Sequence, residues 1–162
     1  MSGGVYVVVF VLGRATTLRV GRLGAFRLSA GRYAYVGSAQ RGLAARIARH
    51  GKRAKPLRWH VDYLSRRARL EAACAWPLAK AAECRLAAAV GRLRGAALAV
   101  PRFGASDCRC PGHLYRLAGP LDPAALLCAA RTGRARARGA AKKVGSRAVG
   151  TETHRAEAHV AL

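Results

Sequence analysis

Carboxylates are the scarcest chemical group in this sequence. Asp and Glu together number 7 among 162 residues, and Glu152 and Glu157 lie close to the end of the chain. The others are Asp62, Glu71, Glu83, Asp107 and Asp122. Two-metal phosphodiester sites need several clustered carboxylates, so this sparse set argues against such a site and for at most one catalytic metal ion.

Long apolar runs are missing as well. The longest, residues 5–12, is far too short to cross a bilayer, and no charged segment precedes it as in a secretory signal. The five cysteines, an odd number without a disulfide-like spacing, are typical of a reducing compartment. We expect a cytoplasmic protein with no membrane partner.

Basic residues are abundant by contrast. Lys and Arg number 30, which gives a formal net charge of +23 at pH 7. Such a surplus predicts attraction to polyanions, with nucleic acid first and anionic membrane surfaces second. A GC-rich genome also enriches arginine, but that bias does not remove acids. We therefore expect a nucleic-acid partner.

Short apolar and aromatic runs separated by Gly-rich turns predict an α/β (α+β) fold with a small, mostly antiparallel sheet of about three to five strands, flanked by helices. The expected strands span 5–12, 18–20, 25–28, 33–37, 70–76 and 114–117. The expected helices span 42–50, 57–67, 79–93 and 122–131. The length suits one domain, at 1–131, followed by a basic Ala/Arg/Gly-rich tail at 132–162 that we expect to be flexible.

The stretch 31–50 organises the chain. An aromatic strand is followed by Gly37, and Ser38 or Gln40 is expected to open the next helix. One side of that helix carries Leu43, Arg46, Ile47 and His50. A guanidinium and an imidazole therefore share a side with two apolar anchors, beside a possible pocket. The alternative is that Arg46 is a surface residue with a buried stem.

Two tripeptides, Gly4-Val5-Tyr6 and Tyr35-Val36-Gly37, accompany Arg46 and His50. This combination resembles the GIY-YIG nuclease superfamily, which is named after those tripeptides. Further ordered motifs lie at 33–39, 46–50, 59–64 and 103–110 with His113-Leu114. Over about residues 4–117 the chain looks like the GIY-YIG-related group catalogued as domain of unknown function 123. That group occurs alone or fused to endonuclease III-type DNA repair proteins.

The resemblance implies a GIY-YIG-like sheet and a DNA-binding endonuclease that uses one Mg or Mn ion, with DNA favoured over RNA. By this likeness Glu83 would hold the metal, and Tyr6 and Tyr35 would line the site, one of them contacting the attacking water. Arg46 would stabilise charge on the phosphate, and His50 would assist proton transfer or hold phosphate. The alternatives are that both tyrosines simply pack and that Glu83 is solvated on an Ala-rich helix.

A second group of candidates surrounds these residues. His60 and Asp62 lie two positions apart, so on a helix they point to different sides and do not form a dyad. Trp59 and Tyr63 fit a core role, and His60 fits either a buried hydrogen-bonded role or a functional one. Asp107 and His113 are candidates to reach the same pocket as Arg46.

The loop around Cys108 offers soft metal ligands. Cys108, Cys110 and His113, together with Cys84, could supply four ligands to zinc. The alternative is a tight loop in which buried thiols act as small hydrophobes. Cys74 and Cys128 are expected in the core.

Candidate phosphate-binding cations fall in two segments. Those around the expected first helix are Arg41, Arg49, Lys52, Arg53 and Lys55. Those of the tail are Arg134, Arg136, Arg138, Lys142 and Lys143. Because Ala and Gly separate them, the tail cations are suited to bind phosphates without reading the base sequence. The alternative is that the tail is a dispensable terminus.

Three functions therefore remain in view. The first is a single-metal endonuclease that could act in DNA repair. The second is a non-catalytic nucleic-acid-binding module on the same fold. The third is a zinc-bearing interaction domain that partners a DNA repair enzyme.

Overall fold

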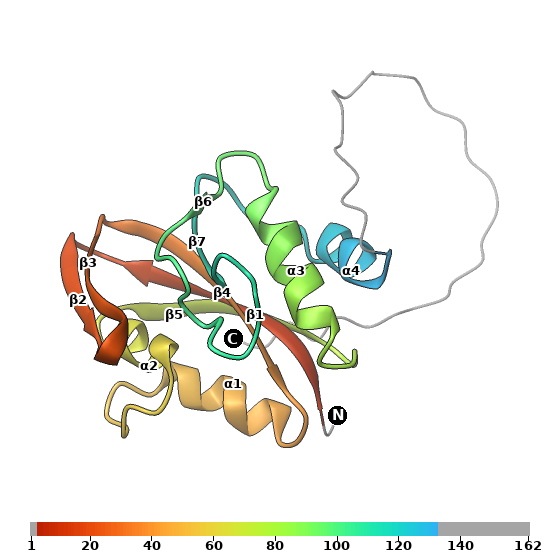
Figure 1. The fold of residues 1–162 in the computed structure, drawn as a ribbon, viewed down its shortest axis with the longest axis horizontal. Coiled ribbons are helices and arrows are strands. Elements are labelled where there is room, and N and C mark those ends of the chain that lie inside the picture. Colours follow the sequence, from red (N-terminus) through yellow and green to blue (C-terminus); the bar gives the residue numbers. More distant parts are fainter. Residues whose placement is uncertain (1–2, 133–162) are drawn as a thin grey trace.

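A five-stranded antiparallel sheet forms the centre of the molecule (Figure 1). The computed structural model describes residues 3–132, so the expectations for the tail cations lie outside the described residues. The strand order is β5-β1-β4-β7-β6. These strands are β1 (Gly4–Leu12), β4 (Gly31–Ala39), β5 (Arg69–Trp76), β6 (Ala97–Leu98) and β7 (Leu114–Leu117).

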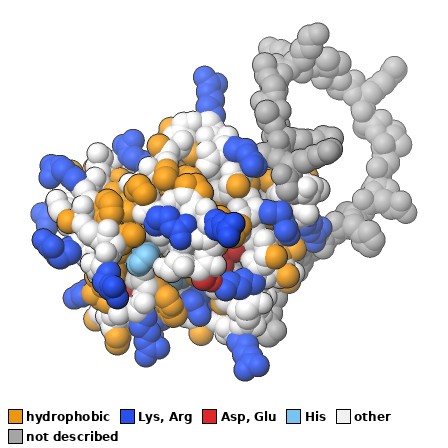
Figure 2. Space-filling model, in the orientation of Figure 1, with side chains coloured by type: hydrophobic (Ala, Val, Ile, Leu, Met, Phe, Trp, Pro, Cys, Tyr) orange, Lys and Arg blue, Asp and Glu red, His pale blue; other side chains and the backbone are white. Residues whose placement is uncertain are grey.

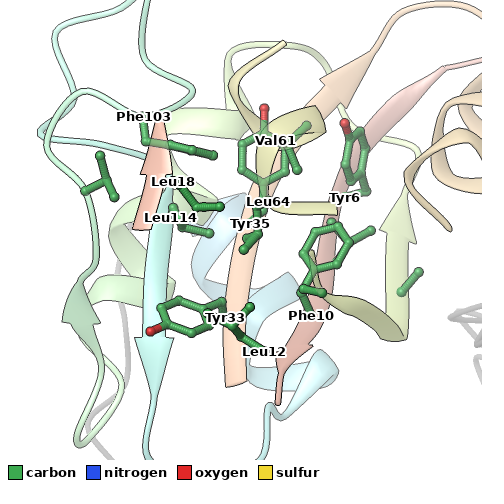
Figure 3. Close-up of a cluster of buried hydrophobic side chains, with 14 of the residues drawn as sticks. Tyr6, Phe10, Leu12, Leu18, Tyr33, Tyr35, Val61, Leu64, Phe103 and Leu114 are labelled. Carbon is green, nitrogen blue, oxygen red and sulfur yellow. The ribbon is translucent and has the colours of Figure 1, made fainter. Parts of the chain in front are cut away.

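The central strand β1 is buried on both faces, as its Val-rich sequence predicts. Side chains alternate along a strand, so Val5, Val7 and Val9 face one core cluster. Tyr6 and Val8 face the other, which Figure 3 shows. The sheet is therefore the middle layer of three.

Both faces of the sheet are covered by helices (Figure 1). The Tyr6 face packs against α1 (Leu43–Gly51) and α2 (His60–Ser65). It also packs against a separate hairpin, β2 (Thr16–Val20) and β3 (Gly24–Leu28), joined by the short turn η1 (Gly21–Leu23). The Val5 face packs against α3 (Ala82–Gly91) and α4 (Pro123–Thr132). None of the helices described in residues 3–132 has the length and apolar character needed to cross a membrane.

The α+β fold predicted from the sequence is confirmed. The helix predicted at 57–67 is shorter than expected, because Trp59 is extended, with φ −125° and ψ 158°. The Asp62 carboxylate accepts hydrogen bonds from the backbone N–H groups of Arg58 and Trp59, which fixes the helix start at His60. Trp59 is therefore the N-cap residue of α2 and not part of the helix.

The start of α1 also differs from the prediction. Strand β4 continues through Ser38 to Ala39, because its pairing with β1 extends to Gly4. The helix N-cap is Gly42, whose φ of +62° lies in the left-handed region that glycine tolerates. Ser38 is therefore a strand residue and does not cap the helix.

Of the two cysteines predicted in the core, one is buried and the other is exposed. Cys74 on β5 is buried, but Cys128 on α4 is exposed. Helix α4 turns Leu126, Ala129 and Ala130 toward the sheet, and a residue two positions after Leu126 points away from that side.

Close backbone packing explains the first glycine of the Gly4-Val5-Tyr6 tripeptide. A Cβ atom on Gly4 would lie 2.2 Å from the carbonyl oxygen of Trp76 on β5. We predict that Gly4→Ala lowers the free energy of unfolding by about 2 kcal/mol, because strands β1 and β5 must separate. Urea denaturation measures this. Gly13→Ala is the matched control, because no atom lies within 4 Å of its added Cβ. Equal stability of the two variants would contradict the prediction.

Candidate functional site

A cleft of about 640 Å³ lies at the end of the sheet where β1 begins and β4 ends. All five candidate catalytic residues line it: Tyr6, Tyr35, Arg46, His50 and Glu83. Residues distant in the sequence are therefore brought together as the motifs predict.

Antiparallel pairing places the two tyrosines beside each other. Tyr6 pairs with Gly37 and Val8 pairs with Tyr35, so both tyrosines point to the same face of the sheet (Figure 3). A Cβ atom on Gly37 would lie 2.6 Å from the Tyr6 hydroxyl. The glycine of the second tripeptide thus makes room for the tyrosine of the first.

Tyr6 and His50 form the buried floor of the cleft. The Tyr6 hydroxyl and His50 Nε2 are hydrogen-bonded at 2.8 Å, and His50 is 1% exposed. Burial, followed by the nearby Lys55 ammonium, lowers the pKa of His50 to about 4. Burial also raises the pKa values of Tyr6 and Tyr35. At neutral pH both phenols keep their protons, and the imidazole is neutral and able to accept one.

Arg46 supplies positive charge to the same cleft. Its guanidinium carbon lies 4.0 Å from the centroid of the Trp59 ring, and that of Arg49 lies 4.8 Å away. Trp59, predicted as core, is half-buried and lines the cleft. Stacking on an aromatic face holds a guanidinium in one orientation while leaving its N–H groups free to bind an anion.

Glu83, in the first turn of α3, lies at the junction of the two helical layers. Its side chain is 12% exposed, and its Oε2 accepts a hydrogen bond from the Ser38 hydroxyl. Oε1 lies 3.0 Å from His113 Nδ1 in a close contact that lacks hydrogen-bond geometry. Glu83 is therefore held in place and is not a freely solvated side chain.

Asp62 lies apart from this arrangement. Its carboxylate is 0% exposed and forms ion pairs with Arg49 and Lys55. His60 instead lines the cleft, where its Nδ1 accepts a hydrogen bond from Gly104 N–H. The expectation that His60 and Asp62 point to different sides is met. Of the predicted phosphate-binding cations, Arg49 and Lys55 are thus already paired with a buried carboxylate.

The remaining predicted cations around α1 are exposed on the surface. Arg41 is exposed and lines the cleft, and Lys52 and Arg53 are exposed just beyond α1. Figure 2 shows Lys and Arg side chains spread over one face of the molecule, with acidic groups confined to a small area. A phosphate chain crossing this face would meet cations around a nearly acid-free surface.

Sequence reasoning did not place Ser38, Arg58 or Lys80 at the cleft. Ser38 reaches Glu83 because it alternates with Gly37 along β4 and so faces the α3 layer. Strand alternation was the signal that could have found it. Lys80 forms an exposed ion pair of 2.6 Å with Asp107, which also lines the cleft. The sequence carried no signal for that pairing.

The four predicted zinc ligands also come together. Cys84, Cys108, Cys110 and His113 each offer a ligand atom, and these atoms all lie within 4.8 Å of one another. This cluster could hold a metal ion. His113 contacts Glu83 but does not itself line the cleft, so of the pair expected to reach the pocket of Arg46 only Asp107 does so.

A sequence profile of one protein family, described as domain of unknown function DUF123, matches residues 5–134. The chain belongs to the DUF123 family. No curated protein and no solved structure matches the chain. The cleft and the Cys/His cluster described above lie wholly within the DUF123 region.

The depressed pKa of His50 predicts a pH dependence of stability. In the unfolded chain His50 gains its proton near pH 6.5, whereas in the folded protein it does so near pH 4. The contribution of neutral His50 to the free energy of unfolding is therefore complete above pH 6.5. As the pH falls from 6.5 toward 4, the free energy of unfolding decreases by roughly 3 kcal/mol, because the unfolded chain binds the proton more readily.

Urea denaturation between pH 7 and pH 4.5 tests this, with His50→Gln expected to flatten the profile. His60→Gln is the comparison and should flatten the profile less, because burial lowers the pKa of half-buried His60 by a smaller amount than that of His50. An NMR titration giving His50 an unperturbed pKa would contradict the prediction.

Proposed function

We propose that this protein binds nucleic acid in the cleft and hydrolyses phosphodiester bonds with one divalent metal ion. The observation that carries the proposal is that the Glu83 carboxylate and the Arg46 guanidinium line one cleft beside Tyr6 and His50. Within residues 3–132, the other acids are engaged elsewhere or exposed. Glu71 pairs with Arg32, Asp62 is buried, and Asp122 accepts hydrogen bonds at the start of α4. Asp107 also lines the cleft, but it is exposed and pairs with Lys80.

The donor atoms suit a hard cation. A carboxylate and a hydroxyl, from Glu83 and Ser38, offer the oxygen ligands that Mg²⁺ and Mn²⁺ prefer, and such ions commonly keep several waters. When bound, the ion would polarise the phosphoryl oxygen and lower the pKa of a coordinated water. One cleft carboxylate that is largely buried fits one ion.

Other residues of the cleft stabilise charge, orient water and bind phosphate. Arg46, oriented by Trp59, neutralises charge that develops on the phosphate. Tyr6 presents its hydroxyl oxygen to the attacking water as a hydrogen-bond acceptor, and the hydrogen bond between that hydroxyl and His50 Nε2 holds it in place. Arg41 and Arg58, which also line the cleft, contact neighbouring phosphates.

Cleavage of nicked, flapped and branched DNA with Mg²⁺ or Mn²⁺ tests the catalytic proposal. We predict that Arg46→Ala and Glu83→Gln each lower the rate by about 100-fold or more, because each removes charge stabilisation at the reacting phosphate. Arg27→Ala and Glu71→Gln are the matched controls, because Arg27 is exposed on β3 and Glu71 pairs with Arg32. Cleavage that survives both cleft substitutions would refute this assignment.

A non-catalytic binding module is the second candidate, and one observation favours it. Both oxygens of Glu83 already have protein neighbours, Ser38 and His113, which reduces their availability to a catalytic ion. In that case DNA binds in the cleft without metal-dependent cleavage.

Binding itself has a measurable electrostatic signature. We predict that log Kd rises linearly with log salt concentration and that Arg41→Ala reduces the slope by about 1, because one phosphate contact is lost. Fluorescence anisotropy with labelled DNA and RNA measures this and compares the two polymers. Arg27→Ala should leave the slope unchanged. A slope near zero for the wild type would contradict nucleic-acid binding by the cleft.

A further inference from the structure

Three thiols and one imidazole meet beside the cleft, although they come from separate parts of the chain. Cys84 lies in the first turn of α3, Cys108 and Cys110 lie in the loop at 99–113, and His113 ends that loop. All four are buried or half-buried, and their ligand atoms lie within 4.8 Å of one another. The thiols are free and not joined as disulfides.

The spacing is close to that of a tetrahedral metal site. With metal–sulfur bonds of about 2.3 Å, tetrahedral geometry separates sulfur ligands by about 3.8 Å. Cys108 Sγ and His113 Nε2 are already 3.6 Å apart. Adjustments of about 1 Å would therefore complete the shell, which side-chain rotation can supply.

The loop backbone is shaped to present these ligands. Arg102 N–H donates to Pro111 O at 2.6 Å, and His113 N–H donates to Phe103 O at 2.7 Å, so the loop closes on itself. Arg102 has φ +61°, an unfavourable conformation for a residue with a side chain, and its guanidinium donates to Cys110 O. The strained residue thus closes the loop that carries Cys108 and Cys110.

We propose that Cys84, Cys108, Cys110 and His113 bind one zinc ion that fastens the loop at 99–113 to α3. Three thiolates and one imidazole form a closed ligand set typical of structural zinc, with no position left for substrate. Soft sulfur ligands select zinc over Mg²⁺ or Mn²⁺. The site is therefore distinct from the oxygen ligands at Glu83, and the proposal does not depend on nuclease activity.

His113 links the zinc site to the cleft. Its Nε2 faces the thiols, while its Nδ1 lies 3.0 Å from Glu83 Oε1, and the side chain is 1% exposed. Zinc on Nε2 places the remaining ring proton on Nδ1, beside the carboxylate. A small rotation of the ring on coordination would align this N–H with Glu83. Glu83 is then a positioning residue for the zinc ligand, and zinc in turn fixes the carboxylate in the cleft wall.

Metal analysis of the full chain tests the site. We expect one zinc ion per chain by mass spectrometry of the metal content, and near-complete loss in Cys108→Ser and Cys84→Ser. Cys128→Ser is the matched control, because Cys128 is exposed on α4, and it should retain zinc. Folded wild-type protein without zinc, or zinc that survives both cluster substitutions, would overturn the proposal.

Cobalt substitution of the wild type keeps the test decisive if the cysteine variants fail to fold. We expect intense thiolate-to-cobalt charge-transfer absorption and the visible bands of a tetrahedral site. Octahedral cobalt without those bands would overturn the proposal.

Zinc affinity of Glu83→Gln tests the link through His113. We expect affinity to fall by about 10- to 100-fold while saturating zinc still binds one ion per chain. Glu71→Gln should bind zinc like the wild type, since Glu71 pairs with Arg32. Unchanged affinity in Glu83→Gln would refute the link. Arg46→Ala should keep its zinc, so loss of cleavage there separates the catalytic proposal from this one.

Discussion

The antiparallel register of β1 and β4 is the constraint on which the rest of the structure depends. It sets Tyr6 opposite Gly37, and the missing side chain of that glycine leaves space for the tyrosine ring. A shift of β1 by one residue would turn Tyr6 toward the α3 layer, and the same shift of β4 would instead send Ser38 to the α1 layer. The two tripeptides of the sequence therefore lie on neighbouring strands and pack against each other through this pairing.

That pairing also explains why the cleft lies at the end of the sheet. There the two helical layers converge, so α1 contributes Arg46 and His50 while α3 contributes Glu83. Side chains alternate along β4, so Ser38 presents its hydroxyl on the α3 side. Gly37, on the α1 side, has no side chain and leaves room for the Tyr6 ring. A carboxylate and a guanidinium from opposite layers can thus face one ligand.

Electrostatic pairing divides the abundant cations into structural and available groups. Arg49 and Lys55 are held by the buried carboxylate of Asp62, which also fixes the start of α2 and with it the position of Trp59. Trp59 then supports Arg46. The scarcity of acids in the sequence thus has a structural counterpart, since one buried Asp organises a cation-rich wall.

The sequence predicted the sheet and most helices, because strand and helix periodicity report which residues share a side. The grouping of Tyr6, Arg46 and Glu83 was expected only from the resemblance of the motifs, since periodicity does not report contacts between distant segments. Helix boundaries, helix rotation and contacts between distant segments were not predicted. The start of α2 depends on hydrogen bonds to Asp62, which helical spacing at Trp59 and Tyr63 cannot reveal. The exposure of Cys128 follows from how α4 rotates on the sheet, and the contact of His113 with Glu83 joins segments 30 residues apart.

The most direct test of the central claim is anomalous X-ray diffraction from crystals soaked with MnCl₂ and a short DNA strand. The claim is that Glu83, Arg46 and Tyr6 surround a single site for a metal-bound phosphate. We predict a manganese peak at the Glu83 carboxylate, inside the cleft, with a phosphate toward Arg46. Manganese absent from Glu83, with DNA bound on another face, would contradict it.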